Sequence, residues 1–150
     1  MIKLKFFALF LILSYAIGPV TFAQTAESSP HQKFLGNWSN IDPAGDLVKV
    51  QVFKQKDGKH WQIQAWGKCE PKNCDWGKVT LNLVGSSISD KSFEYGFAVW
   101  EFEGRSKVDM TTYLLLKIDG EQLVIEKITI FSDGSKRSNY RSFYLLKREK

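Results

Sequence analysis

The sequence predicts an all-β protein: an eight-stranded antiparallel up-and-down barrel that follows an N-terminal signal peptide. Three observations lead to this prediction. Runs rich in β-branched and aromatic residues alternate with short turn signals, no segment has a convincing helical period, and most turns are short enough for hairpins. Eight sequential antiparallel strands leave two exposed edges unless the sheet closes into a barrel. A two-sheet sandwich is the second possibility, although it usually needs longer crossover connections.

The first 23 residues have the pattern of a secretory signal peptide. Two lysines precede the short apolar run "FFALFLILSYAIG", and a signal peptidase could cut after Ala23. An uncleaved anchor helix is the alternative, but the run is short for a membrane span. We therefore expect a secreted or periplasmic protein with no membrane span after cleavage, a disordered polar leader over residues 24–33 and one β-barrel domain over residues 34–150.

Each predicted strand lies between two turn signals such as "KDGK" or "IDGEQ". The strands "LVKVQVF" and "VDMTTYLLLKI" alternate apolar and polar residues, as expected of strands with one buried face. The strand "FEYGFAVWEF" is apolar on both faces, which predicts that a partner, a loop or another subunit covers its outer side. The eight strands are expected near residues 36–40, 46–55, 60–68, 76–84, 93–102, 108–117, 122–131 and 139–148.

Charge and composition exclude several classes of function. The net charge is +5, both signs are interspersed, and no arginine cluster or aromatic–basic ladder is present, so we expect no nucleic-acid partner. The chain has two histidines and no Gly-x-Ser-x-Gly nucleophile motif. Glu101 and Glu103 lie on one strand face, where solvated charges are a simpler interpretation than paired catalytic carboxylates. We expect a non-enzyme without a cofactor.

Both cysteines lie in one short loop, "WGKCEPKNCDWG". A redox centre, a metal site and a disulfide are the possible interpretations. Thioredoxin-like motifs keep two residues between the cysteines rather than four, and a zinc site would need two further ligands from a chain with two histidines. In an exported protein the pair Cys69 and Cys74 indicates a structural disulfide, which would stabilise the fold by about 2 kcal/mol and fix the register of a hairpin.

The strands on either side of this loop require a β-bulge. If Cys69 lay directly opposite Cys74 in a regular hairpin, the apolar faces of the two strands would point in opposite directions. One extra residue near 74–76 aligns the apolar faces and places Ala65 opposite Val79. The sequence therefore predicts a bulge on the second strand.

This register brings four candidate ligand-binding residues to the polar face of the hairpin. If that face lies outside the barrel, the two tryptophans form an exposed rim patch. If it lies inside, they line a pocket with amide partners. The four residues are Trp66, Trp76, Gln64 and Asn82.

The segment "FLGNWSN" at residues 34–40 resembles the first-strand signature of the calycin superfamily, which includes lipocalins, fatty-acid-binding proteins and avidins. In its Gly-x-Trp motif, Gly36 and Trp38 match. The resemblance implies that Trp38 lies at the closed end of a barrel under a basic side chain from the last strand. Lys147 and Arg148 end that strand, and we expect Arg148 there because a guanidinium stacks on an indole.

The segments "LGNWSNIDP", "WGKCEPKNCDWG" and "FSDGSKRSNYRSFY" also resemble a family of small secreted bacterial proteins. This resemblance covers most of the predicted mature chain and implies no activity.

Two functions from different classes remain. The first is a secreted non-enzymatic binding protein that holds a small apolar or amphipathic ligand in the barrel lumen. The alternative is a protein- or glycan-binding interaction or inhibitor module that uses an exposed patch at Trp66 and Trp76. An open lumen would favour the first function. A barrel filled by its own side chains, with the tryptophans exposed, would favour the second.

Overall fold

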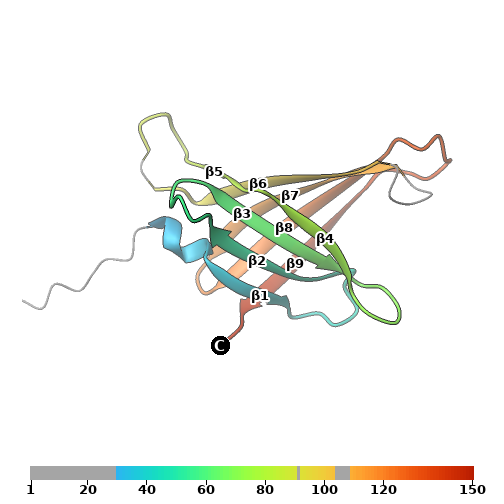
Figure 1. The fold of residues 1–150 in the computed structure, drawn as a ribbon, viewed down its shortest axis with the longest axis horizontal. Coiled ribbons are helices and arrows are strands. Elements are labelled where there is room, and N and C mark those ends of the chain that lie inside the picture. The colour runs from blue at the N-terminus through green and yellow to red at the C-terminus, as the bar shows by residue number, and fades with distance from the viewer. Residues whose placement is uncertain (1–29, 91, 104–108) are drawn as a thin grey trace, which may run out of the picture.

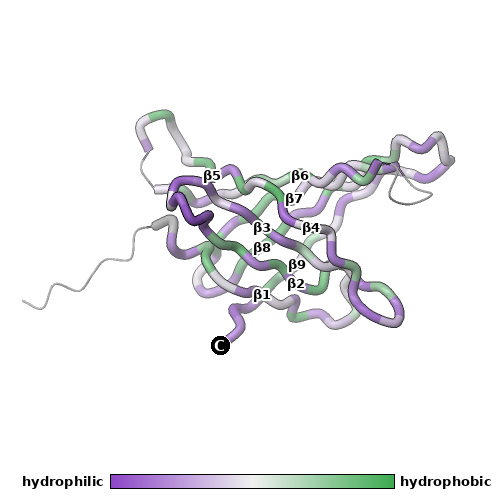
Figure 2. The backbone as a smooth tube through the Cα atoms, in the orientation of Figure 1, coloured by the Kyte–Doolittle hydropathy of each residue, from purple (hydrophilic) through white to green (hydrophobic). Residues whose placement is uncertain are grey.

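A computed structural model of the protein describes residues 30–90, 92–103 and 109–150. The predicted signal peptide and its cleavage site lie outside the described residues. Across these ranges the chain forms one antiparallel sheet that curls into a nearly closed up-and-down barrel (Figure 1). Figure 2 shows hydrophobic stretches along the strands, whereas the hairpin ends are largely hydrophilic.

The described residues form a short 3-10 helix and nine strands. Along the sheet the strands lie in the order β4-β3-β2-β1-β9-β8-β7-β6-β5, so nearly every strand pairs with its neighbours in sequence and β1 pairs with β9. The elements are η1 (Pro30–Phe34), β1 (Gly36–Asn40), β2 (Leu47–Lys54), β3 (Trp61–Gly67), β4 (Cys74–Thr80), β5 (Asn82–Val84), β6 (Tyr95–Phe102), β7 (Met110–Asp119), β8 (Gln122–Phe131) and β9 (Tyr140–Arg148).

The prediction of eight strands is wrong by one because the expected strand 76–84 is divided at Leu81. Its first part, β4, pairs with β3, whereas its second part, β5, pairs with β6. Leu81 still donates its backbone N–H to the Trp61 carbonyl at 2.9 Å, and its side chain is buried. The chain therefore passes from one edge of the sheet to the other without a turn, and the alternation of the sequence continues across the break.

The barrel wall has a seam between β4 and β6. Within the described residues no strand ladder joins these two strands, although they lie beside each other. The Trp100 indole N–H instead donates to the Gly77 carbonyl at 3.1 Å. The Trp76 ring packs in T-shaped contacts with Trp100 and Phe102, with ring centroids 5.7 and 5.8 Å apart. Aromatic side chains thus bridge the gap that backbone pairing leaves open.

One end of the barrel is closed by η1, which lies at the left in Figure 1. Phe34 is fully buried, and the indole N–H of the buried Trp38 donates to the Phe34 carbonyl at 2.9 Å. Residues 30–33 were expected to belong to a disordered leader. The structure includes them in η1, since these contacts hold the end of η1 against the core.

The middle of the lumen is filled by apolar side chains from all sides of the barrel. The buried residues come from inward positions that alternate along each strand, as expected for a sheet with one face in the core. They include Val50, Val52, Ile63, Ala65, Ala98, Trp100, Leu114, Leu116, Leu123, Ile125 and Leu146.

The β-bulge lies where the sequence predicted it. The ladder between β3 and β4 steps from the pair Trp66–Asp75 to the pair Ala65–Gly77, which leaves Trp76 as the extra residue. Gly77 has a positive φ of 82° at this step, a conformation that favours glycine. The bulge aligns the apolar faces of the two strands.

The register around the bulge differs from the prediction by two residues. Ala65 lies opposite Gly77 and not opposite Val79. Cys74 pairs with Gly67, so the first cysteine lies in the loop rather than in the ladder. A shift of two positions keeps every side chain on its face, so the inward set of β3 is unchanged.

Candidate functional site

The closed end holds the contact between the first and last strands. Trp38 lies opposite Arg148 in the ladder, and the Arg148 Cζ atom lies 4.2 Å from the centroid of the Trp38 ring. The guanidinium also donates to the Lys33 carbonyl at 2.6 Å and to the Leu35 carbonyl. A Cβ atom on Gly36 would lie 2.6 Å from Arg148 Nη1. The glycine of the Gly-x-Trp motif therefore leaves room for the arginine.

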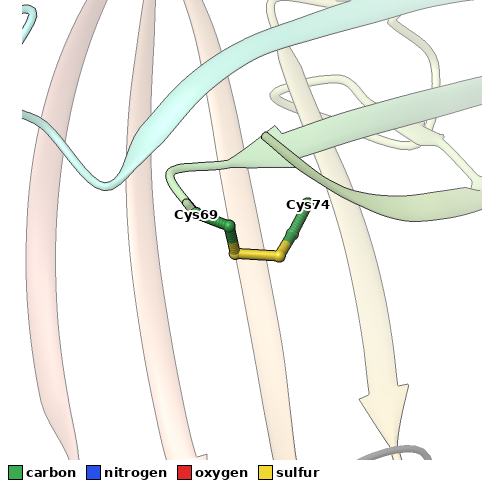
Figure 3. The surroundings of a disulfide bond; sticks show 2 residues. All are labelled: Cys69 and Cys74. Atoms are coloured by element: carbon green, nitrogen blue, oxygen red, sulfur yellow. A yellow bond between two sulfur atoms is a disulfide. The ribbon is translucent and has the colours of Figure 1, made fainter. Parts of the chain in front are cut away.

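The cysteine loop lies at the opposite end of the barrel, which we call the mouth. The predicted disulfide between Cys69 and Cys74 is confirmed, with 5.5 Å between the two Cα atoms. Figure 3 shows the bond joining the two arms of the loop at the end of the β3–β4 hairpin. The bond holds one rim of the mouth together.

The structure separates the two tryptophans that the sequence placed on one face. Trp66 lies outside the barrel, where the Lys49 ammonium is 4.5 Å from its ring centroid. Trp76 turns inward at the bulge and packs against the core. A Cβ atom on Gly67 would lie 2.6 Å from Trp76 Nε1, so this glycine makes room for the ring. The bulge residue is free of the strand alternation, which is why its direction could not be predicted from spacing.

The other two predicted ligand-binding residues also lie on the outside. Gln64 donates to Asp75 at 2.7 Å on the outer face of β3 and β4. Asn82 is exposed on β5. The structure therefore brings Gln64 near Trp66 on the outer face and leaves Trp76 alone among the four in the lumen.

A pocket of about 420 Å³ opens at the mouth, with Trp76 in its wall. Trp76, Phe102 and Met110 contribute apolar surface to its lining, which also includes the buried residues Thr112, Thr129 and Lys127. The residues that line it are Asp46, Gly67, Lys68, Cys69, Cys74, Asp75, Trp76, Phe102, Met110, Thr112, Lys127, Thr129 and Tyr140.

A second hollow at the closed end is larger, at about 590 Å³, but it is a weaker candidate for a ligand site. Exposed charged side chains of η1 and of the C-terminal residues, such as Lys33, Lys147 and Glu149, make up much of its lining. None of its lining residues is a buried charged group. The mouth pocket combines apolar surface with such a group, which is typical of ligand sites.

Lys127 is the buried charged group of the mouth pocket. Its side chain is 3% exposed and forms an ion pair with Asp46, whose side chain is 53% exposed. The Tyr144 hydroxyl donates to the other carboxylate oxygen of Asp46. The Lys127 ammonium donates to the Tyr140 hydroxyl at 3.3 Å and lies 5.0 and 5.6 Å from the ring centroids of Tyr140 and Tyr144.

The ion pair keeps both partners charged. Burial alone would raise the pKa of Asp46, but hydrogen bonds from Lys127 and Tyr144 outweigh it, and the pKa is lowered. Burial alone would lower the pKa of Lys127, but the Asp46 carboxylate outweighs it, and the pKa is raised. Burial raises the pKa of Tyr144, so its hydroxyl stays protonated and able to donate.

Sequence reasoning missed Lys127 and Asp46. One signal for Lys127 was available: in "QLVIEKITIF" it follows Leu123 and Ile125 at inward positions, so strand alternation points the lysine into the lumen. Asp46 carries no comparable signal, because it lies in a turn and reaches Lys127 across 81 residues of sequence.

The outer face of β6 to β9 is rich in apolar side chains. Phe97 stacks on Tyr113 with ring centroids 6.1 Å apart, which covers part of the strand that the sequence shows as apolar on both faces. Leu115, Phe143 and Leu145 on the same outer side remain exposed. In the described residues nothing outside the sheet covers them.

The described residues contain no group of three or more His, Cys, Asp or Glu residues placed to hold a metal ion. They also contain no helix that is long and apolar enough to cross a membrane.

Comparisons of the chain with protein-family models, with curated proteins and with solved structures found no match.

Proposed function

We propose that this chain is an exported, non-enzymatic binding protein that holds a small amphipathic molecule in the mouth pocket of its barrel. The observation that supports it best is the pocket itself: about 420 Å³, lined by Trp76, Phe102 and Met110 together with the buried Lys127. Pockets of a few hundred Å³ with an apolar lining and a few placed polar groups are typical of small-molecule sites.

The size of the ligand follows from the packing below the pocket. Leu114 and Ile125 are fully buried and Trp100 is nearly so, and they fill the middle of the barrel. A long hydrocarbon chain would have to displace this core, which would leave strained side chains or a cavity elsewhere. The ligand we propose is therefore short and is held at the mouth rather than along the barrel axis.

Two features support export. The first 23 residues have the pattern of a signal peptide. The chain also has a disulfide between its only two cysteines, and such bonds persist in oxidising compartments.

The alternative function, a protein- or glycan-binding module, has less support. It was expected to use Trp66 and Trp76 together as a rim patch, but Trp76 turns into the lumen. Trp66 with Lys49 and Gln64 remains on the outer face as a smaller contact surface. The apolar outer face of β6 to β9 is a second place where a protein could bind.

The two tryptophans provide a matched test, because one faces the pocket and the other faces away from it. We would titrate the neutral fluorescent probe N-phenyl-1-naphthylamine into the purified mature protein. We expect saturable binding that Trp76→Ala weakens at least about 10-fold and Trp66→Ala changes by less than about 2-fold, since a ring that anchors a ligand is worth 2 kcal/mol or more. Thermal melts would check that both variants fold. An equal loss in the two variants would contradict a site in the mouth pocket, and a loss in Trp66→Ala alone would move the site to the outer face.

A further inference from the structure

We propose that the mouth pocket selects small organic acids, and that Asp46 is an internal counter-ion whose place at Lys127 the ligand's carboxylate takes. This inference rests on the proposed function and names the ligand class for the same site. It derives from the burial of Lys127, the exposure of Asp46 and the direction of the hydrogen-bond donors around them.

The buried Lys127 ammonium needs an anion beside it even when the Asp46 carboxylate moves away. Its side chain is 3% exposed, and among the ion pairs of the described residues its carboxylate partner is Asp46. Removing one partner of a buried ion pair leaves an uncompensated charge at low dielectric, which is strongly unfavourable. The site is therefore stable with Asp46 in place or with another anion in its position.

The two members of the pair differ in their freedom to move. Lys127 lies in the middle of β8, with neighbours on both sides in the sheet. Asp46 lies in the turn before β2, its side chain is 53% exposed, and its backbone carbonyl is held by the Lys68 N–H at 2.8 Å. A rotation of the Asp46 side chain would move its carboxylate into water without moving the backbone. The anion position can thus be vacated from the solvent side.

The groups left behind suit a carboxylate. The Lys127 ammonium and the Tyr144 hydroxyl both donate to Asp46, one to each carboxylate oxygen. The Tyr140 hydroxyl lies 3.3 Å from the same ammonium. An incoming carboxylate would find the same two donors, and charge-assisted bonds of this kind are among the strongest in proteins. Trp76 and Phe102 offer an apolar surface for the rest of the molecule.

A cationic ligand fits this site poorly. Both carboxylate oxygens of Asp46 already accept a hydrogen bond, one from Lys127 and one from Tyr144. A cation close enough to reach Asp46 would also be repelled by the Lys127 ammonium. The rim of the pocket favours neither cationic nor anionic ligands, since Lys68 and Asp75 carry opposite charges there. The preference for anionic over cationic ligands therefore depends on Lys127.

A pair of isosteric ligands tests the charge directly. We would measure the binding of 2-naphthoate and of its neutral amide, 2-naphthamide, to the mature protein by calorimetry at pH 7. We expect naphthoate to bind at least about 10-fold more tightly, a difference of about 1.4 kcal/mol. Lys127→Met, which keeps the volume and removes the charge, should reduce this ratio to near 1. Lys49→Met, on the outer face beside Trp66, is the matched control for loss of one lysine.

If the ligand takes the place of Asp46, removing the Asp46 charge should change the ligand preference in the opposite direction to removing the Lys127 charge. Asp46→Asn removes the competing charge and should increase the preference for naphthoate over naphthamide by a further 3-fold or more. A lower preference in this variant would contradict the exchange. Equal binding of the two ligands by the parent protein would overturn the anion proposal while N-phenyl-1-naphthylamine binding at Trp76 still supports a ligand pocket. Failure of all three molecules to bind would overturn both proposals.

Discussion

The two ends of the barrel each place a cation against aromatic rings, but they satisfy its charge in different ways. At the closed end Arg148 stacks on Trp38 and donates to backbone carbonyls of residues 33 and 35, which cannot leave. At the mouth Lys127 pairs with the half-exposed side chain of Asp46. Arg148 is thus held by backbone groups of the fold itself, whereas Lys127 is held by a side chain that we propose a ligand can replace.

Glycine makes both arrangements possible. A side chain at Gly36 would collide with Arg148, and one at Gly67 would collide with the Trp76 ring, each at 2.6 Å. Gly36 also has a positive φ of 125°, which other residues rarely adopt. At the closed end the space is filled by a residue of the last strand. At the mouth it is filled by an aromatic ring that borders a pocket.

The largest expected effect is at the closed end. Trp38→Ala removes a large, fully packed side chain and should lower the free energy of unfolding by about 3–5 kcal/mol. Denaturant melts of parent and variant would measure the difference. A loss below about 1 kcal/mol would mean that the closed end is not part of the cooperative core.

The disulfide tests the stability of the mouth rim. Replacing both cysteines, as in Cys69→Ser with Cys74→Ser, removes a short covalent loop and should reduce stability by about 2 kcal/mol on the loop-entropy model. The same melts would measure it, with the reduced parent as a control. Free thiols in the native oxidised protein would remove the basis of this prediction.

The ion pair at the mouth should make stability depend on pH. The pKa of Asp46 is lowered in the folded state, so its contribution is present above its unfolded pKa of about 4 and is lost as the pH falls through the lower folded value. Asp46→Asn should lower the free energy of unfolding at pH 7 by about 1–2 kcal/mol, a value that already allows for the solvent exposure of the side chain. The difference in stability between parent and variant should shrink at pH 2. Melts at both pH values would show it. A difference that grows in acid would contradict the assigned pair.

Arg148→Ala should have the smallest effect, about 0.5–1 kcal/mol, because a cation–π contact at an exposed guanidinium contributes little. The double variant with Trp38→Ala separates a true contact from two independent losses. A coupling energy indistinguishable from zero would show that stacking on the ring does not stabilise the closed end.

Local patterns were sufficient to predict much of this structure. Alternation and turn signals gave the β class and the positions of most hairpins, and the cysteine spacing gave the disulfide. The conflict between two apolar faces gave the bulge at Trp76. Each of these depends on residues close together in the sequence.

The features that were missed depend on closure of the sheet. The break at Leu81 arises because β4 and β5 pair with different neighbours, and the sequence of the strand itself shows no interruption. The direction of Trp76 depends on the space beside Gly67. The contact of Asp46 with Lys127 and Tyr144 exists only once opposite walls of the barrel meet.

We expect the pairing of β1 with β9 to make the last step of folding slow. Contacts of Arg148 span 113 and 115 residues of chain, and closing a loop of that length costs about 2 kcal/mol more in entropy than closing a hairpin of ten residues. The hairpins within β6 to β9 are local and can form early, so β1 is expected to join last. Until it does, β9 has an open edge that can pair with another chain, and the time spent in that state determines how readily the protein aggregates.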